Sequence, residues 1–462
     1  MSPLLLLLLL LVLSVAGYVM GQQKALGLAK KTGGTRNLHS LPVYYGALTA
    51  LWCCLPAFFM FLFWIAFEQS IITGLMAADL PEEALALPAA RLNVLISDIQ
   101  SLASGNIVSG EVTPLMQKAA SHYLSLKGIG QMITSVIVLA AAVTGMLLVH
   151  GRIRPDMRAR NQVENALMGL LIVCSTIAIF TTIGIVLSIL YEAVRFFQQI
   201  PVTDFLFGLD WSPQMAIRED QVGSSGAFGA VPVFVGTILI SAIAMFVAAP
   251  IGLLSAIYLS EYADRRLRAV AKPLLEILAG IPTVVYGFFA ALVVAPLIRN
   301  SGAQIGLDVS SESALAAGLV MGIMIIPFVS SLSDDVINAV PQTLRDGAYS
   351  VGATRSETIK HVLVPAALPG IVGGLLLAVS RAIGETMIVV MAAGLSANMT
   401  ANPLQAVTTV TVQIVTLLVG DQEFDSPKTL AAFALGLVLF IGTLFLNIIA
   451  LTVVRKYRER YE

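Results

Sequence analysis

The chain is 462 residues long, and its composition excludes an ordinary soluble protein because 57% of its residues are hydrophobic and only 12% are charged. A soluble domain carries about twice that charged fraction, so we predict an all-α, polytopic membrane protein. The formal net charge is −1. This balance gives no indication of nucleic-acid binding, which normally requires an excess of positive charge.

Several kinds of chemistry are not expected of this chain. The four histidines lack metal-ligand spacing, and the three cysteines, Cys53, Cys54 and Cys174, all fall in apolar stretches where small hydrophobic residues are common. No Gly-Lys-Ser or Gly-Lys-Thr is present, so we predict that the chain hydrolyses no nucleotide through a P-loop. We therefore expect no catalytic residues, no metal site and no cofactor.

The first third of the sequence predicts three membrane spans, over residues 1–20, 44–67 and 128–149. No basic residue precedes the first span, whereas Lys24, Lys30 and Lys31 follow it. We therefore expect an uncleaved helix with its N-terminus outside. Residues 68–127 are polar and are predicted to lie outside as short amphipathic helices, one of them starting at Pro81-Glu82-Glu83.

Six further spans are predicted, which brings the total to nine. They cover residues 166–193, 231–259, 274–298, 313–332, 370–394 and 430–454. Each segment predicted to face inward carries three or four Lys or Arg residues, whereas the outward ones carry one to three. Basic loops resist translocation, so we expect a cytoplasmic C-terminus. The most evident division separates an N-terminal extension, 1–160, from a second domain, 161–462.

One inward segment, Asp334 to His361, is long and polar. Ala348, Tyr349 and Val351 have helix-compatible spacing, Gly352 can end that helix, and Ser356-Glu357-Thr358-Ile359 can start another. Pro365 and Pro369 suit the first turns of the span that follows. We predict a helix, a bend and a second helix, a surface that could bind another protein.

The spacing within this segment resembles the E-A-A motif of ABC importer permeases. The matching residues are Asp346, Gly347, Ala348, Gly352 and Pro365. Asp replaces Glu and Gly replaces the first Ala, and the glycine weakens the helix by about 1 kcal/mol. The resemblance implies coupling helices at about 342–361 that contact a separate ATPase. An ordinary amphipathic loop helix is the competing interpretation.

The span predicted over 370–394 carries Arg381 and Glu385 near its middle. Residues four apart share one face of a helix and can neutralise each other. An unpaired charge at mid-membrane costs roughly 2.5 to 3.5 kcal/mol, so this face must point into the protein or a wet cavity. The residues alone leave two interpretations open: a structural ion pair, or a transit site for an anion.

Two blocks resemble the PstC-type permease family of bacterial phosphate importers. They are Arg381-Ala382-Ile383-Gly384-Glu385-Thr386-Met387 and Glu276 to Gly287, within a match over about residues 165–460. The sister family, PstA, typically ends the first block in Ala, so Met387 favours PstC. The resemblance implies a six-span type I importer permease core, with Arg381 and Glu385 on the phosphate pathway.

The resemblance also implies an assembly in the bacterial inner membrane. Its partners would be a second, PstA-like permease, a dimer of a cytoplasmic ABC ATPase that hydrolyses the ATP, a periplasmic phosphate-binding protein and membrane lipid. It gives no role for residues 1–160. The alternatives are a permease for sulfate, molybdate or another oxyanion, an ATP-independent secondary transporter that uses Arg381 and Glu385, and a membrane sensor that transports nothing.

Overall fold

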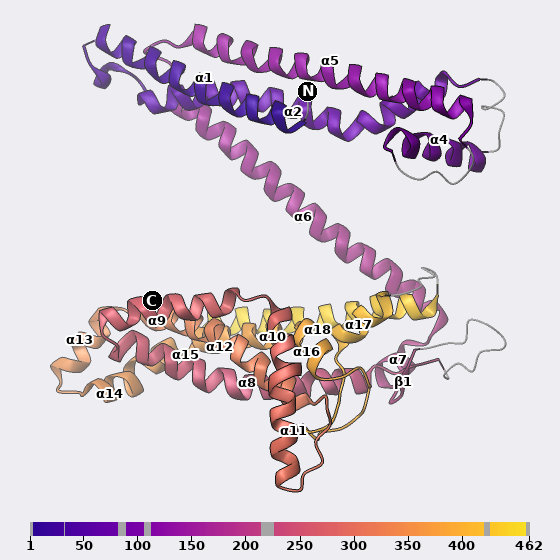
Figure 1. Cartoon of the computed structure of the whole chain (residues 1–462). Helices are drawn as coiled ribbons and strands as arrows, with labels where there is room; N and C mark the ends of the chain where they lie inside the picture. The colour runs from indigo at the N-terminus through magenta and orange to yellow at the C-terminus, as the bar shows by residue number, and fades with distance from the viewer. Residues whose placement is uncertain are drawn as a thin grey trace. The chain divides into compact units, whose positions relative to one another are not determined.

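The computed structural model describes residues 3–31, 33–81, 89–105, 112–213, 226–419 and 426–458. It divides into two compact units, Met1–Phe180 (unit 1) and Thr181–Glu462 (unit 2), coloured by residue number in Figure 1. Across the described residues, nine helices are long and apolar enough to cross a membrane. This confirms the all-α class, since the chain is almost entirely helical, and the number of spans predicted from the sequence.

Unit 1 is built on three helices that pack side by side, α1 (Pro3–Lys31), α2 (Pro42–Ala78) and α5 (Pro114–Arg152). At 1.5 Å per residue α2 is about 55 Å long, which exceeds the roughly 30 Å of a hydrocarbon core. Because α2 continues to Ala78 and α5 begins at Pro114, the stretch between the second and third spans is shorter than the predicted 68–127. A short 3₁₀ turn, Thr35–Asn37, follows α1.

The end of α2 and the start of α5 enclose a small helix, α4 (Ala89–Ala103). Its Ile99 is fully buried among Met76 and Met116 of the longer helices, as expected for an amphipathic helix. Pro81 precedes α4 outside any helix, and the predicted helix start at Glu82 and Glu83 lies outside the described residues. The next helix, α6 (Ala159–Gln199), begins in unit 1 and continues into unit 2.

Unit 2 contains the remaining elements. They are α7 (Val202–Phe207), β1 (Trp211–Ser212), β2 (Ala227–Phe228), α8 (Val231–Ile257), a π-helical turn (Tyr258–Tyr262), α9 (Arg265–Gly280), α10 (Thr283–Phe289), a second π-helical turn (Ala290–Val294), α11 (Ala295–Gln304), α12 (Ala314–Ala339), α13 (Gln342–Ser350), α14 (Arg355–Thr358), a third π-helical turn (Ile359–Leu363), α15 (Val364–Ile383), α16 (Met387–Ala392), α17 (Val410–Leu418) and α18 (Pro427–Arg458). The two strands pair antiparallel, with Trp211 opposite Phe228.

The central helix of unit 2 is α12. In its apolar 18-residue stretch 61% of the residues are buried, against 6% in the corresponding stretch of α18. The helix α12 packs against α8 through Gly318 and Gly322, which stand one turn apart. A Cβ atom on Gly318 would lie 2.7 Å from the Cβ of Ile243, and one on Gly322 would lie 2.9 Å from the carbonyl oxygen of Ala244. Small residues at this spacing allow two membrane helices to approach closely.

Two of the predicted spans are interrupted, which corrects the sequence-based prediction. The span over 274–298 breaks at Ile281, which is extended because Pro282 follows it. The part before the break belongs to α9, an amphipathic helix with a strongly basic start. The span over 370–394 ends at Ile383, and the separate helix α16 begins only after Glu385.

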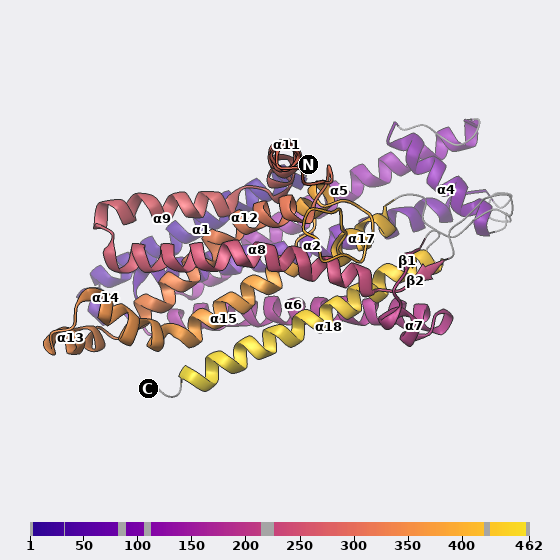
Figure 2. The same cartoon turned by 90° about the horizontal axis from the view of Figure 1, so that it is seen from below.

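The polar segment after α12 has the predicted form of a helix, a bend and a second helix. Gly352 follows α13 with a φ of 86°, a backbone conformation that favours glycine. Thr354 and Glu357 form a capping box at the start of α14. Figure 2 and Figure 1 both place α13 and α14 at the same end of unit 2 as the C-terminal end of α18, with α7 and α17 at the other end.

We predict that Gly322→Leu destabilises unit 2, because the larger side chain forces α12 away from α8. Overpacking of this kind lowers the free energy of unfolding by about 1 to 3 kcal/mol. The melting temperature of the purified chain in detergent, followed by size-exclusion fluorescence, should fall by several degrees. Gly442→Leu on α18 is the control, because nothing lies within 4 Å of a Cβ there. Equal melting temperatures for both variants would contradict the close packing.

Candidate substrate pathway

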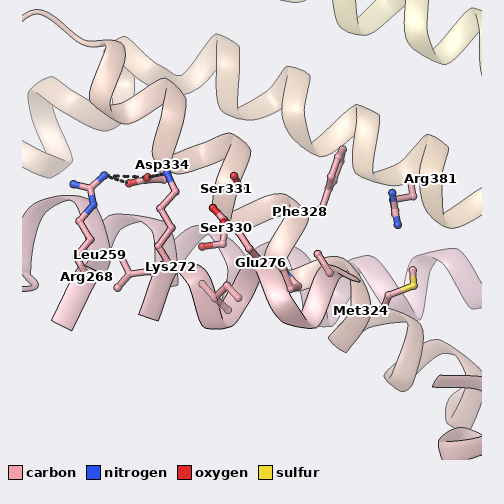
Figure 3. Close-up of a pocket in the computed structure, with 13 residues that line it drawn as sticks. Leu259, Arg268, Lys272, Glu276, Met324, Phe328, Ser330, Ser331, Asp334 and Arg381 are labelled. Carbon is pink, nitrogen blue, oxygen red and sulfur yellow. Dashed lines mark hydrogen bonds and ion pairs between the residues drawn. The ribbon is translucent and has the colours of Figure 1, made fainter. Parts of the chain in front are cut away.

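Unit 2 contains a cavity of about 280 Å³ between α9, α12, the π-helical turn after α8, and the end of α15. Figure 3 shows thirteen lining residues, several of them charged. Arg268, Lys272 and Glu276 come from α9, Asp334 from α12, and Arg381 from α15. The cavity therefore brings together residues from both sequence blocks that resemble phosphate permeases.

Asp334 is the centre of an ion cluster at one end of this cavity. Although its side chain is only 5% exposed, both of its carboxylate oxygens lie 3.0 Å from Nη2 of Arg268, and Oδ2 lies 3.0 Å from Nζ of Lys272. The side-chain amide of Asn338 donates to Oδ1 at 2.8 Å. A buried carboxylate needs such compensation. The cluster consequently fixes α9 against α12.

In the same cluster, both cations are paired with carboxylates. The hydrogen bond to Asp334 raises the pKa of Lys272, although partial burial opposes the shift. Lys272 also lies 3.6 Å from Asp335, so its ammonium stands between two carboxylates. Arg268 and Lys272 therefore contribute little uncompensated charge to the cavity.

Arg381 differs from these two cations. Within the described ranges of the chain it forms no ion pair, and its guanidinium carbon lies 5.6 Å from the centre of the Phe328 ring on α12. It occupies the last turn of α15, where the carbonyl end of the helix dipole favours a positive charge. These contacts hold the guanidinium without neutralising it, so its positive charge remains at the cavity wall.

Glu385 does not pair with Arg381, which corrects one of the two interpretations left open by the sequence. The helix ends between them, and the carboxylate of Glu385 instead accepts the backbone N–H of Met387 at 3.2 Å. The hydroxyl of Thr411 donates to the Glu385 carbonyl at 2.8 Å. Glu385 is not among the residues that line the cavity. Residues four apart face each other only in an unbroken helix, and α15 ends at Ile383, between Arg381 and Glu385.

The two resembling blocks contact each other directly. Within the block Glu276 to Gly287, the hydroxyl of Tyr286 donates to the carbonyl of Leu278 at 2.8 Å, across the break at Pro282. The contact between the two blocks is made by Gly287 and Met387. A Cβ atom on Gly287 would lie 2.7 Å from the sulfur of Met391 and 3.0 Å from the carbonyl oxygen of Met387. The helix α10 therefore packs closely on α16, beside the end of α15.

Sequence reasoning did not single out Arg268, Lys272 or Asp334 as site residues. In the sequence, Arg268 and Lys272 count only among the basic residues of a segment predicted to face inward, although their spacing of four places both on one face of a helix. Asp334 was the first residue of the polar segment, yet it lies within α12 and is buried. An acidic residue at the end of an apolar span was the available signal.

The residues predicted to couple to an ATPase are arranged as follows. Asp346, Gly347 and Ala348 lie on α13, Gly352 forms the bend, and Pro365 is the second residue of α15, after a π-helical turn. Nothing lies within 4 Å of a Cβ on Gly347, and Asp346 is exposed. None of these five residues lines the cavity.

Arg345, which sequence reasoning passed over, anchors this segment to the rest of unit 2. It is 8% exposed and donates to the carbonyls of Val340 at 2.7 Å and Ile337 at 2.9 Å, at the end of α12. It also lies 3.0 Å from the carboxylate of Glu261, in the π-helical turn after α8. These contacts, which we call the Arg345 anchor, join α13 to two long helices.

Comparison with known protein families finds one match in each half of the chain. Residues 248–459 match the family described as binding-protein-dependent transport system inner membrane component, and residues 7–181 match the one described as phosphate ATP-binding cassette transporter.

Curated relatives match about half of the chain. A probable ABC transporter permease protein, YqgH, from Bacillus subtilis is 32% identical, over 58% of this chain and 83% of that one. The phosphate transport system permease proteins PstC of Mesorhizobium japonicum and Haemophilus influenzae are 34% and 33% identical, over 48% and 50% of this chain and 72% and 78% of theirs. The chain thus belongs to the PstC-type family of ABC transporter permeases.

Proposed function

We propose that this chain is the transmembrane permease subunit of an ATP-driven inorganic phosphate importer. The observation that carries the proposal is the guanidinium of Arg381, which has no ion pair among the described residues and lies in a cavity lined by both family blocks. The names of the PstC relatives support phosphate as the substrate. The chain is a transport subunit, and ATP is hydrolysed by a partner chain.

The proposed assembly contains a second, PstA-like permease, a dimer of a cytoplasmic ABC ATPase and a periplasmic phosphate-binding protein. The protein crosses the bacterial inner membrane with its N-terminus outside and its C-terminus in the cytoplasm, because the basic segments then face inward. The permease domain comprises residues 161–462, and residues 1–160 form the N-terminal extension.

Arg381 suits a transient phosphate contact because its planar guanidinium can donate to two oxygens at once. The ion cluster of Asp334 prevents Arg268 and Lys272 from adding their full charge, so the cavity offers phosphate one strong cation. Glu276 lines the same cavity and repels a bound anion. Such a balance permits both entry and release, whereas several free cations would trap the ion.

The proposed coupling route begins at α13 and α14, where the ATPase would bind through Asp346, Gly347, Ala348, Gly352 and Pro365. The Arg345 anchor transmits a displacement of α13 to the end of α12 and to the turn after α8. In turn, α12 carries Phe328 and Asp334, which line the cavity. The ATPase can favour an outward-facing or an inward-facing arrangement of the permease only if its contacts with the permease differ between the two. The helix α12 connects the Arg345 anchor to the cavity.

The first test is Arg381→Gln, which removes the charge but keeps a polar side chain. We expect phosphate uptake by cells that lack other phosphate importers to fall at least tenfold, because a neutral amide replaces the charge-assisted hydrogen bonds. The complex should still assemble. Arg299→Gln, on α11 and outside the cavity lining, is the matched control. Normal uptake in Arg381→Gln would show that Arg381 serves packing only.

The second test replaces residues 342–361 with a flexible Gly-Ser segment of equal length. An ABC permease should then stop co-purifying with its ATPase and lose ATP-dependent uptake, since the docking surface is gone. An ATP-independent carrier needs no such surface and should continue to transport. Persistent phosphate uptake after ATP depletion would therefore favour a secondary transporter.

The third test addresses the Arg345 anchor. Glu261→Gln leaves the buried Arg345 without its carboxylate, and removing one partner of a buried pair costs roughly 3 to 5 kcal/mol when nothing else compensates. Two carbonyls remain here, so we expect the chain to fold while uptake per ATP hydrolysed falls severalfold. Asp308→Asn, at an exposed residue, is the control. Unchanged uptake per ATP would exclude the anchor from coupling.

A further inference from the structure

We propose that unit 1 binds an anionic phospholipid, with an acyl chain in a groove along α2 and the phosphate at Arg152. The groove has a volume of about 600 Å³ and lies between α2, the end of α5 and the start of α6. All of its lining residues belong to unit 1. The proposal is independent of the proposed transport function.

The apolar part of the groove has the length of one membrane leaflet. It extends along α2 from Leu48 to Phe59, which corresponds to about 16 Å at 1.5 Å per residue. Half of a hydrocarbon core of roughly 30 Å is about 15 Å. The wall includes two aromatic side chains, Trp52 and Phe59, that remain 52% and 58% exposed in the chain. An extended acyl chain therefore matches the groove in both length and polarity.

The other end of the groove is polar and positively charged. Arg152 from the last turn of α5 lines it, together with Gln162 and Asn165 of α6. In the part of the chain that the structure describes, the guanidinium of Arg152 has no ion pair. A guanidinium and two side-chain amides that line one groove can together donate to several oxygens of a phosphodiester. Basic pockets between membrane helices bind anionic head groups in this way.

This polar end is preformed. The hydroxyl of Tyr45 donates to the carbonyls of Pro155 at 3.2 Å and Met157 at 3.0 Å, in the turn between α5 and α6. Ala159 and Val163 at the start of α6 are buried against α1, α2 and α5. Because these contacts fix α6 next to α2, little conformational entropy is lost when a ligand orders the site.

The test uses the purified full chain in detergent and native mass spectrometry with added phosphatidylglycerol or phosphatidylcholine. We expect tighter binding of phosphatidylglycerol, and Arg152→Gln should weaken it roughly fivefold, as for one basic residue near an anionic membrane surface. Arg154→Gln is the matched control, since Arg154 is exposed nearby but does not line the groove. Ala166→Trp should also reduce binding, because the indole fills the groove.

Melting temperatures in detergent would show that these variants remain folded. Equal losses for Arg152→Gln and Arg154→Gln would overturn the proposal, because they would indicate a diffuse charge effect. Equal binding of phosphatidylcholine, or full binding by a folded Ala166→Trp, would also overturn it. Displacement of the lipid by millimolar inorganic phosphate would identify the polar end as a site for the free ion and would contradict the lipid assignment.

Discussion

Charges within a membrane protein must be compensated. In unit 2, Asp334, Arg345 and Arg381 meet this requirement in different ways. Asp334 is compensated by Arg268 and Lys272, and Arg345 by Glu261 and two carbonyls. Among the residues that the structure describes, the compensation of Arg381 comes from an aromatic ring and the end of a helix. The strongly compensated groups hold helices together, and the weakly compensated one remains available to a ligand. This difference distinguishes a structural charge from a candidate transport site.

The helix α12 connects these features. It contributes Phe328 and Asp334 to the cavity and carbonyl groups to the Arg345 anchor, and it packs on α8 through two glycines. Close packing makes a helix move as a unit rather than deform. In the proposed coupling, a partner that displaces α13 would act on the cavity through α12, without contacting the substrate.

Unit 1 follows another pattern. Its basic residues gather near the end of α1 and the turn between α5 and α6, and they have few acidic partners in the described residues. Basic residues gathered in this way suit contact with anionic head groups at a membrane surface. The groove beside Arg152 turns this general attraction into a defined site. The extension would thereby tie the permease to the lipid around it.

The sequence by itself determined the number of spans found in the described residues, the helical bend around Gly352 and the family, because hydropathy and spacing are local properties. It could not determine the partners of the charges. Arg268 and Asp334 are 66 residues apart, and Glu261 and Arg345 are 84 apart, so only the packing of whole helices brings them together. Arg381 and Glu385 are neighbours in sequence, yet a break after Ile383 separates their roles. Tertiary structure decided both outcomes, since it sets where helices end and which faces meet.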